Sequence, residues 1–344
     1  MTKKLLLTLL IGTSLLSLDL AQIEATGSLS KKLLNQDSPE LVEASRLSQQ
    51  VVKLYNEKKH DEAMPLAKRA LELREKALGK EHPLVVAALN NLAQVYTAKG
   101  KYADAESLYE RALAAQEKAH GADSPRVAEA LENLAWVRYG RGKVEEATEM
   151  FERALSIREK ALGPLHADTS HSLFNLARLH EKMGSPEKSL PFYRRALEIR
   201  EKALGPNHKQ VGELLDKYAC ALRQARRDSE ADEIEKRAYA ILRGDEPGTG
   251  KISTVTGGVL KGSAIERVRP QYPQAARQAR MTGTIVIEVI VDESGNVIDA
   301  RAKCGPDIFA HASIEAARKW RFTPTTLHGQ SVKVMGTITF NFVP

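Results

Sequence analysis

Side chains that could bind a metal or act in catalysis are spread along the chain and form no compact motif. Three histidines, His82, His166 and His208, occupy one position of a repeating unit, and the two cysteines, Cys220 and Cys304, are far apart. A zinc site needs its ligands gathered around one point, whereas one histidine per unit keeps these side chains apart. We therefore predict that the histidines cap helices, and that the protein binds no metal and no cofactor.

The common catalytic motifs are also missing from the sequence. It contains no Gly-rich phosphate loop, no Gly-x-Ser-x-Gly, no His-Glu-x-x-His and no Cys-x-x-Cys. We predict a protein that is not an enzyme, has no catalytic residues and has no small-molecule substrate. The 51 Lys and Arg exceed the 44 Asp and Glu by only 7 and alternate with Glu along the chain, which argues against nucleic-acid binding.

The elements that carry these residues repeat at a fixed interval. The 344 residues, 42% hydrophobic and 28% charged, suffice for about two folded domains. Gly79, Gly121, Gly163 and Gly205 recur every 42 residues, and such self-similarity indicates a stacked array. Apolar residues at helical spacing predict two helices per unit, at 84–99 and 103–119 in the second one. A glycine ends each unit, and a His or Ser starts the next as an N-cap.

The order of residues within a unit resembles the tetratricopeptide repeat. The residues that carry this resemblance are Leu92, Ala93, Tyr96, Gly100, Ala105, Tyr109 and Ala112. The unit is longer than the usual one of about 34 residues and is similar to the repeats of kinesin light chains. Five copies span residues 40–243. The resemblance implies an all-α superhelix whose first helices line a concave surface that binds a protein segment.

We predict that this groove is lined by polar and aromatic side chains of each first helix. The candidate groove residues are Asn90, Asn91, Gln94, Glu132, Asn133, Trp136, Tyr139, Phe174, Asn175, Arg178 and Lys217. Asn can donate to and accept from a peptide backbone, and the aromatic rings would offer flat apolar contacts. The alternative is that the Asn side chains only bond neighbouring helices. Two basic residues are too few to predict recognition of an acidic chain end.

After residue 243 the hydrophobic period changes from helical to alternating. Residues 244–261 are rich in Gly, Ser, Thr and Pro and predict a linker. A short helix at 274–280 precedes two strands, at 285–291 and 297–302, joined by a turn. A helix at 309–320 and a strand at 331–342 complete the pattern. The sequence therefore predicts a small α+β domain at 262–344, with two helices on a three-stranded antiparallel sheet.

This last region resembles the C-terminal domain of TonB. The motifs are Arg-Pro-Gln-Tyr-Pro at 269–273, Gly-Thr-Ile-Val-Ile-Glu-Val-Ile-Val-Asp at 283–292, Gly-Asn-Val at 295–297, Ala-Ala-Arg-Lys-Trp-Arg-Phe-Thr-Pro at 316–324 and Thr-Ile-Thr-Phe-Asn-Phe at 337–342. The resemblance implies that the tail of an outer-membrane transporter adds as a strand to the edge of the sheet. The residues it assigns to this contact are Arg269, Gln271, Tyr272, Pro273, Val332, Val334, Gly336 and Ile338.

Two other interpretations of the C-terminal region remain open. Tyr272, Trp320 and Phe322 can be core residues with no direct part in binding. A second copy of the chain can cover the last strand and form a homodimer, because an open edge is prone to pairing.

The first 25 residues have the layout of a secretory signal peptide. Lys3 and Lys4 precede the Leu-rich stretch 5–18, and small residues follow up to Ala25. We therefore predict a periplasmic or cell-envelope protein that acts as a non-enzymatic adaptor between proteins. The alternative is that the stretch stays uncleaved as an inner-membrane anchor, which would make the protein a TonB-type energy transducer.

Overall fold

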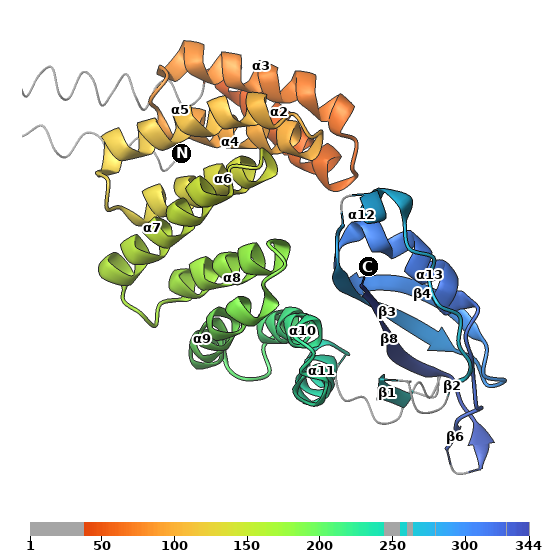
Figure 1. Ribbon diagram of the computed structural model, residues 1–344. Helices are drawn as coiled ribbons and strands as arrows, with labels where there is room; N and C mark the ends of the chain where they lie inside the picture. Colours follow the sequence, from red (N-terminus) through yellow and green to blue (C-terminus); the bar gives the residue numbers. More distant parts are fainter. Residues whose placement is uncertain (1–37, 244–254, 260–263, 279, 328, 344) are drawn as a thin grey trace, which may run out of the picture. The chain divides into compact units, whose positions relative to one another are not determined.

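The computed structural model describes residues 38–243, 255–259, 264–278, 280–327 and 329–343 (Figure 1). The predicted signal peptide, residues 1–25, lies outside the described residues, as does most of the predicted linker. The chain forms two compact units. The first contains described residues 38–122 and 136–143, and the second contains the described residues within 123–135 and 144–343.

Helices follow one another without an intervening strand through the described residues up to 243. They are α2 (Pro39–Asn56), α3 (His60–Leu78), α4 (Pro83–Ala98), α5 (Tyr102–His120), α6 (Pro125–Gly140), α7 (Val144–Leu162), α8 (Ala167–Lys182), α9 (Pro186–Leu204), α10 (Lys209–Gln224) and α11 (Asp228–Arg243). The helices predicted at 84–99 and 103–119 correspond to α4 and α5, so the repeat of two helices per unit is confirmed.

Local sequence signals explain where these helices begin and end. The ring Nδ1 atoms of His82, His166 and His208 accept the backbone N–H two residues further on, each at 3.2 Å, so each histidine is an N-cap as predicted. Helix α3 ends at Gly79, whose φ of 80° lies in the left-handed region that glycine adopts without a steric penalty. Each repeat therefore carries its own start and stop signals.

The C-terminal region is a mixed α+β structure. Its elements are β1 (Val255–Val259), β2 (Ala264–Glu266), α12 (Gln274–Gln278), β3 (Gly283–Val291), β4 (Val297–Cys304), η3 (Asp307–Phe309), α13 (Ala310–Arg318), β5 (Arg321–Phe322), β6 (Thr326–Leu327), β7 (Gln330–Ser331) and β8 (Val334–Phe342). The main sheet has the order β1-β8-β3-β4. Its last three strands are antiparallel and are the three that were predicted.

The fourth strand, β1, was not predicted. It pairs in parallel with β8 and belongs to the stretch that the sequence indicated as linker. By contrast, β3 and β8 pair continuously from Gly283 opposite Phe342 to Val291 opposite Val334. The three antiparallel strands thus form the frame of the sheet, and β1 is an addition to its edge.

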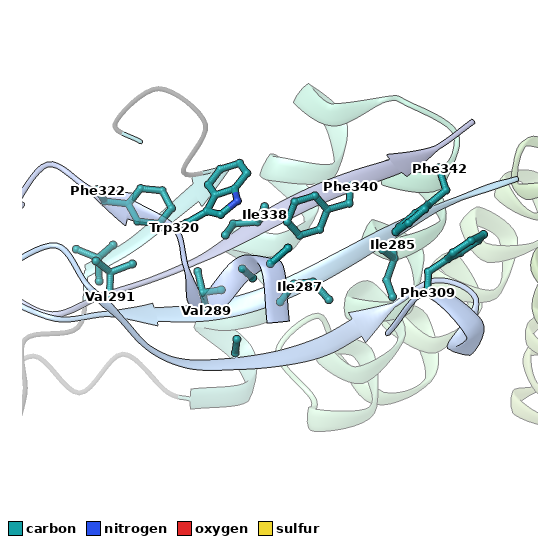
Figure 2. Close-up of a cluster of buried hydrophobic side chains, with 14 of the residues drawn as sticks. Ile285, Ile287, Val289, Val291, Phe309, Trp320, Phe322, Ile338, Phe340 and Phe342 are labelled. Atoms are coloured by element: carbon teal, nitrogen blue, oxygen red, sulfur yellow. The ribbon is translucent and has the colours of Figure 1, made fainter. Parts of the chain in front are cut away.

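The core of the C-terminal region lies on one face of this sheet (Figure 2). The alternating residues Ile285, Ile287, Val289 and Val291 of β3 are at most 3% exposed and point into it. Phe309 and Phe342 stack with their ring centroids 4.1 Å apart. Large aromatic side chains bury 150–250 Å² each, so these contacts dominate the cohesion of the domain.

Of Tyr272, Trp320 and Phe322, the last two belong fully to this core. Trp320 and Phe322 are 8% and 2% exposed, and the Trp320 Nε1–H donates to the Val268 carbonyl at 2.8 Å. Tyr272 is half-buried, packs edge-on against the rings of Phe309 and Phe342, and donates its hydroxyl to the Met281 carbonyl.

A glycine at the β3–β4 turn has a close backbone neighbour. Gly295 has a φ of 88°, and a Cβ there would lie 1.9 Å from the Phe322 carbonyl oxygen. We expect Gly295→Ala to lower the free energy of unfolding by about 3 kcal/mol, because strain and a backbone clash combine.

Gly329 is the matched control for this substitution. Its φ is 81°, and a Cβ there would have nothing within 4 Å. Gly329→Ala should lower the free energy of unfolding by only about 1 kcal/mol, because alanine is disfavoured in the left-handed conformation. Urea unfolding of both variants, followed by circular dichroism, measures the difference, and equal losses would contradict the close approach at Gly295.

Within the described part of the chain, every helix is too short or too polar to cross a membrane.

Candidate partner-binding surfaces

The predicted groove residues of the first unit are all at least partly accessible. Gln94 is exposed, and Asn90, Asn91, Trp136 and Tyr139 are half-buried. The rings of Trp136 and Tyr139 meet edge to face, with their centroids 6.2 Å apart, and burial raises the pKa of the Tyr139 hydroxyl. These residues therefore combine a polar stretch on α4 with an aromatic pair on α6.

Two predicted groove residues of the second unit are buried, and their prediction as groove residues is wrong. Glu132 is 3% exposed and Asn175 is 4% exposed. The Glu132 carboxylate accepts from Arg158 Nη1 at 2.8 Å and from the Ser172 hydroxyl at 2.6 Å. His171 Nδ1 lies 3.2 Å from the second carboxylate oxygen of Glu132 and 3.4 Å from Asn175 Nδ2.

The physical reason for this correction is the cost of burying a charge. A buried carboxylate has to be paired and hydrogen-bonded, and the partners of Glu132 come from the next two helices, α7 and α8. Burial by itself would raise the pKa of Glu132, but His171, Arg158 and Ser172 outweigh it and hold that pKa below its usual value. Asn175 Nδ2 contacts His171 within α8 itself, which differs from the predicted alternative of bonds to neighbouring helices.

The remaining predicted residues of the second unit are accessible to different extents. Lys217 is exposed, and Asn133, Phe174 and Arg178 are half-buried. The guanidinium of Arg178 lies 5.7 Å from the centre of the Phe174 ring, which also packs against Tyr193. Phe174 thus has a packing role besides any contact with a partner.

In the C-terminal region, the structure places the predicted transporter-binding residues on two separate surfaces. The first is a groove of about 910 Å³ between the segment at 268–278 and α13. Arg269, Gln271, Tyr272 and Pro273 line one side of it, and Lys319 lines the other. Arg269, Gln271 and Lys319 are exposed, so the rim of this groove is polar and positively charged.

The second surface is the β8 edge, by which we mean the backbone of β8 on the side away from β3. Val334, Gly336 and Ile338 are buried, and Val332 lies before the strand, where its N–H donates to the Thr325 carbonyl. The sequence predicted an edge free along residues 331–342. The structure corrects this, because β1 pairs with β8 opposite Val334, Met335 and Thr337. In the described residues, 338–342 pair with β3 alone.

The second unit also contains a disulfide that the sequence did not predict. Cys220 of α10 and Cys304 at the end of β4 are bonded, with their Cα atoms 6.0 Å apart. Beside it, Lys303 forms ion pairs with Glu235 and, at 3.3 Å, with Asp216. Burial would lower the pKa of Lys303, but these two carboxylates raise it above its usual value. The predicted export of a chain with two cysteines was the one signal that could have indicated this bond.

The described residues hold no cluster of three or more His, Cys, Asp or Glu side chains arranged to bind a metal.

The helical array and the C-terminal sheet define a repeat protein with an appended small α+β domain. The family model described as tetratricopeptide repeat matches residues 51–118, 87–160, 137–202 and 168–244, more than half of the chain. The chain belongs to the tetratricopeptide repeat family. The family model described as Gram-negative bacterial TonB protein C-terminal matches residues 268–344.

Curated relatives match the C-terminal region. The chain is 32% identical over 68 residues to a protein named TonB from Vibrio cholerae, covering 19% of this chain and 28% of the relative. It is 34% identical over 76 residues to a protein of the same name from Xanthomonas campestris, covering 21% of this chain and 34% of that protein. The chain thus spans about a third or less of the relatives it matches.

Solved structures match the helical array. One is described as Podosopora anserina putative kinesin light chain nearly identical TPR-like repeats, with a TM-score of 0.51, 24% identity, and coverage of 62% of this chain and all of that one. Another is BtubC (BKLC) from P. vanneervenii, with a TM-score of 0.51, 22% identity, and coverage of 70% and 98%. At these identities the likeness shows the fold alone, which agrees with the resemblance to kinesin light chain repeats.

Proposed function

We propose that the protein is a non-enzymatic adaptor of the cell envelope that joins two protein partners. The tetratricopeptide repeats suggest protein–protein interaction, and the C-terminal domain suggests a role like that of TonB. In this proposal the array binds a protein segment, while the tail of an outer-membrane transporter adds as a strand to the C-terminal sheet. An N-terminal signal peptide delivers the chain to the periplasm.

The observation that carries the proposal is the unpaired backbone at the β8 edge. Along residues 338–342, β8 bonds to β3 on one side, and no described strand pairs with it on the other. Unpaired N–H and C=O groups in a row are a template for one more strand. The groove at 268–278 with its positive rim supplies a second surface on the same domain.

Site-specific cross-linking tests strand addition. A photoreactive residue at Asn341, which is exposed on β8, should cross-link to a TonB-dependent outer-membrane transporter in envelope preparations. The matched control is Ile298, which is 54% exposed on β4 at the opposite edge of the sheet. Several-fold more transporter cross-linked at Asn341 than at Ile298 is expected. Equal yields at the two edges would rule out pairing at β8.

The groove of the array has a corresponding test. A photoreactive residue at the exposed Gln94 on α4 should cross-link to a protein other than the transporter, whereas one at Arg69 on α3 should not. Both positions are accessible and lie in the first unit. If the two positions capture the same proteins in the same yield, the array does not bind its partner through the first helix of each repeat.

The second candidate function is a membrane-anchored, TonB-type energy transducer. The likeness of residues 268–344 to proteins named TonB favours it. Pulling on a transporter requires a firm hold on the inner membrane, so this function needs an uncleaved N-terminal segment. The first residue of the protein purified from its envelope separates the two functions: a start near Thr26 excludes the anchored transducer, and an intact N-terminus favours it.

A further inference from the structure

The chain fills part of its own partner-binding edge. Strand β1 lies parallel to β8, with Val255 opposite Val334, Thr256 opposite Met335 and Val259 opposite Thr337. This stretch of β8 is continuous with residues 338–342, on which the proposed function places the partner. A partner strand that used the whole of β8 would therefore meet β1.

Strand β1 is a weak occupant of this edge. Its register shifts between Thr256 and Val259, whereas β3 pairs with β8 without a shift over nine residues. Its sequence, Val-Thr-Gly-Gly-Val, has two adjacent glycines. Each glycine costs about 0.5–1 kcal/mol in a strand interior, because its backbone loses more conformational freedom than that of other residues. A segment without glycines would pair more strongly with the same edge.

The position of β1 in the chain compensates for this weakness. It lies between α11, which ends at Arg243, and β2, which pairs with β5. The Cys220–Cys304 bond and the Lys303 ion pairs join α10 and α11 to the same sheet. A segment tethered on both sides competes at an effective concentration in the millimolar range. Weak pairing is then enough to keep β1 on β8 in the absence of a segment that pairs with β8 more strongly.

We propose that β1 is an internal placeholder, and that the partner binds by exchange. The partner is an extended segment of another protein that runs parallel to β8, contains β-branched residues in place of the two glycines, and displaces β1. This inference rests on the proposed strand addition at β8. Such a segment binds only the molecules from which β1 is released. Its apparent dissociation constant is therefore the intrinsic one divided by the released fraction.

A fluorescent peptide is the probe for exchange. Its sequence is that of residues 251–260 with Gly257 and Gly258 replaced by Val and Thr, and the control peptide has prolines at alternate positions. The full-length chain with Thr256→Pro and Val259→Pro is the released variant, because proline lacks the N–H that a strand needs. We expect the released variant to bind the probe about 10-fold more tightly than the natural chain does, and neither to bind the control peptide.

The outcomes separate this inference from the proposed function. Equal affinities for the two chains would overturn the placeholder and leave strand addition intact. No binding by either chain would overturn both, provided that the released variant melts cooperatively. Hydrogen exchange on the natural chain tests the exchange without relying on a variant that could misfold. When the probe saturates the natural chain, hydrogen exchange should rise at residues 255–259 and stay slow at 334–342, and continued protection of 255–259 would also overturn the exchange.

Discussion

Reduction of the Cys220–Cys304 bond is expected to lower the free energy of unfolding of the second unit by about 4.5 kcal/mol. The estimate follows from the loop that the bond closes, since its cysteines are 84 residues apart and the entropy of the unfolded chain falls with loop length. Urea unfolding with and without a dithiol reductant measures the loss. Before reduction, the intact mass should be lower than that of the dithiol form by two hydrogen atoms.

The chain with Cys220→Ser and Cys304→Ser is the control for this prediction. It should unfold at the lower urea concentration whether reductant is present or not, because it has no bond to lose. If the natural chain and the double variant unfold together under oxidising conditions, the two sulfur atoms are not bonded in the native protein. The bond would then contribute nothing to the position of β1.

Replacing Arg158 by leucine is expected to destabilise the same unit by about 3–5 kcal/mol, because it leaves the buried carboxylate of Glu132 without its main counter-charge. Arg158 Nη1 also donates to the Asp168 carbonyl at 3.2 Å and to the Ser172 hydroxyl at 2.7 Å. The loss of these hydrogen bonds lowers the free energy of unfolding further. Urea unfolding at neutral pH measures the total decrease.

The double variant Glu132→Leu and Arg158→Leu tests the mechanism. It should recover most of the lost stability, because replacing both members of a buried ion pair by apolar residues is often neutral. If the double variant is as unstable as Arg158→Leu alone, the burial of an unpaired carboxylate is not the cause of the loss.

The pH dependence of stability has a definite sign at this site. The pKa of Glu132 is lower in the folded chain than its usual value, so its ionised form stabilises the fold. That contribution is complete above the usual pKa of a glutamate and is lost as the pH falls through the lowered value. In the Arg158→Leu variant the same carboxyl loses its main positive neighbour, so the difference in stability between the two chains should shrink in acid.

Much of the fold was predictable because its signals are local. The N-caps at His82, His166 and His208, the left-handed Gly79 and the helical spacing of apolar residues lie within a few positions of the elements they define. The same is true of the alternation along β3 that places Ile285 and its companions in the core. Patterns of this kind are enough to indicate the repeat family and the likeness to the TonB C-terminal domain.

The errors arose where the decisive partner is far away in the sequence. A position on the first helix of a repeat can face a groove or a neighbouring helix, and Glu132 turns inward because Arg158 and Ser172 come from two later helices. The glycines of β1 are typical of a linker, and pairing with β8 across 79 residues, from Val255 to Val334, overrides that local preference.

Helix limits, strand alternation, membership in the tetratricopeptide repeat family and the likeness of residues 268–344 to the TonB C-terminal domain thus follow from short-range residue patterns. These patterns depend on backbone preference and on the spacing of apolar side chains. Burial of Glu132, the bond between Cys220 and Cys304 and the occupant of the β8 edge follow from packing instead. Each of these depends on which distant segments meet in three dimensions. The free energy of such a contact depends on both of its partners, and these are far apart in the sequence.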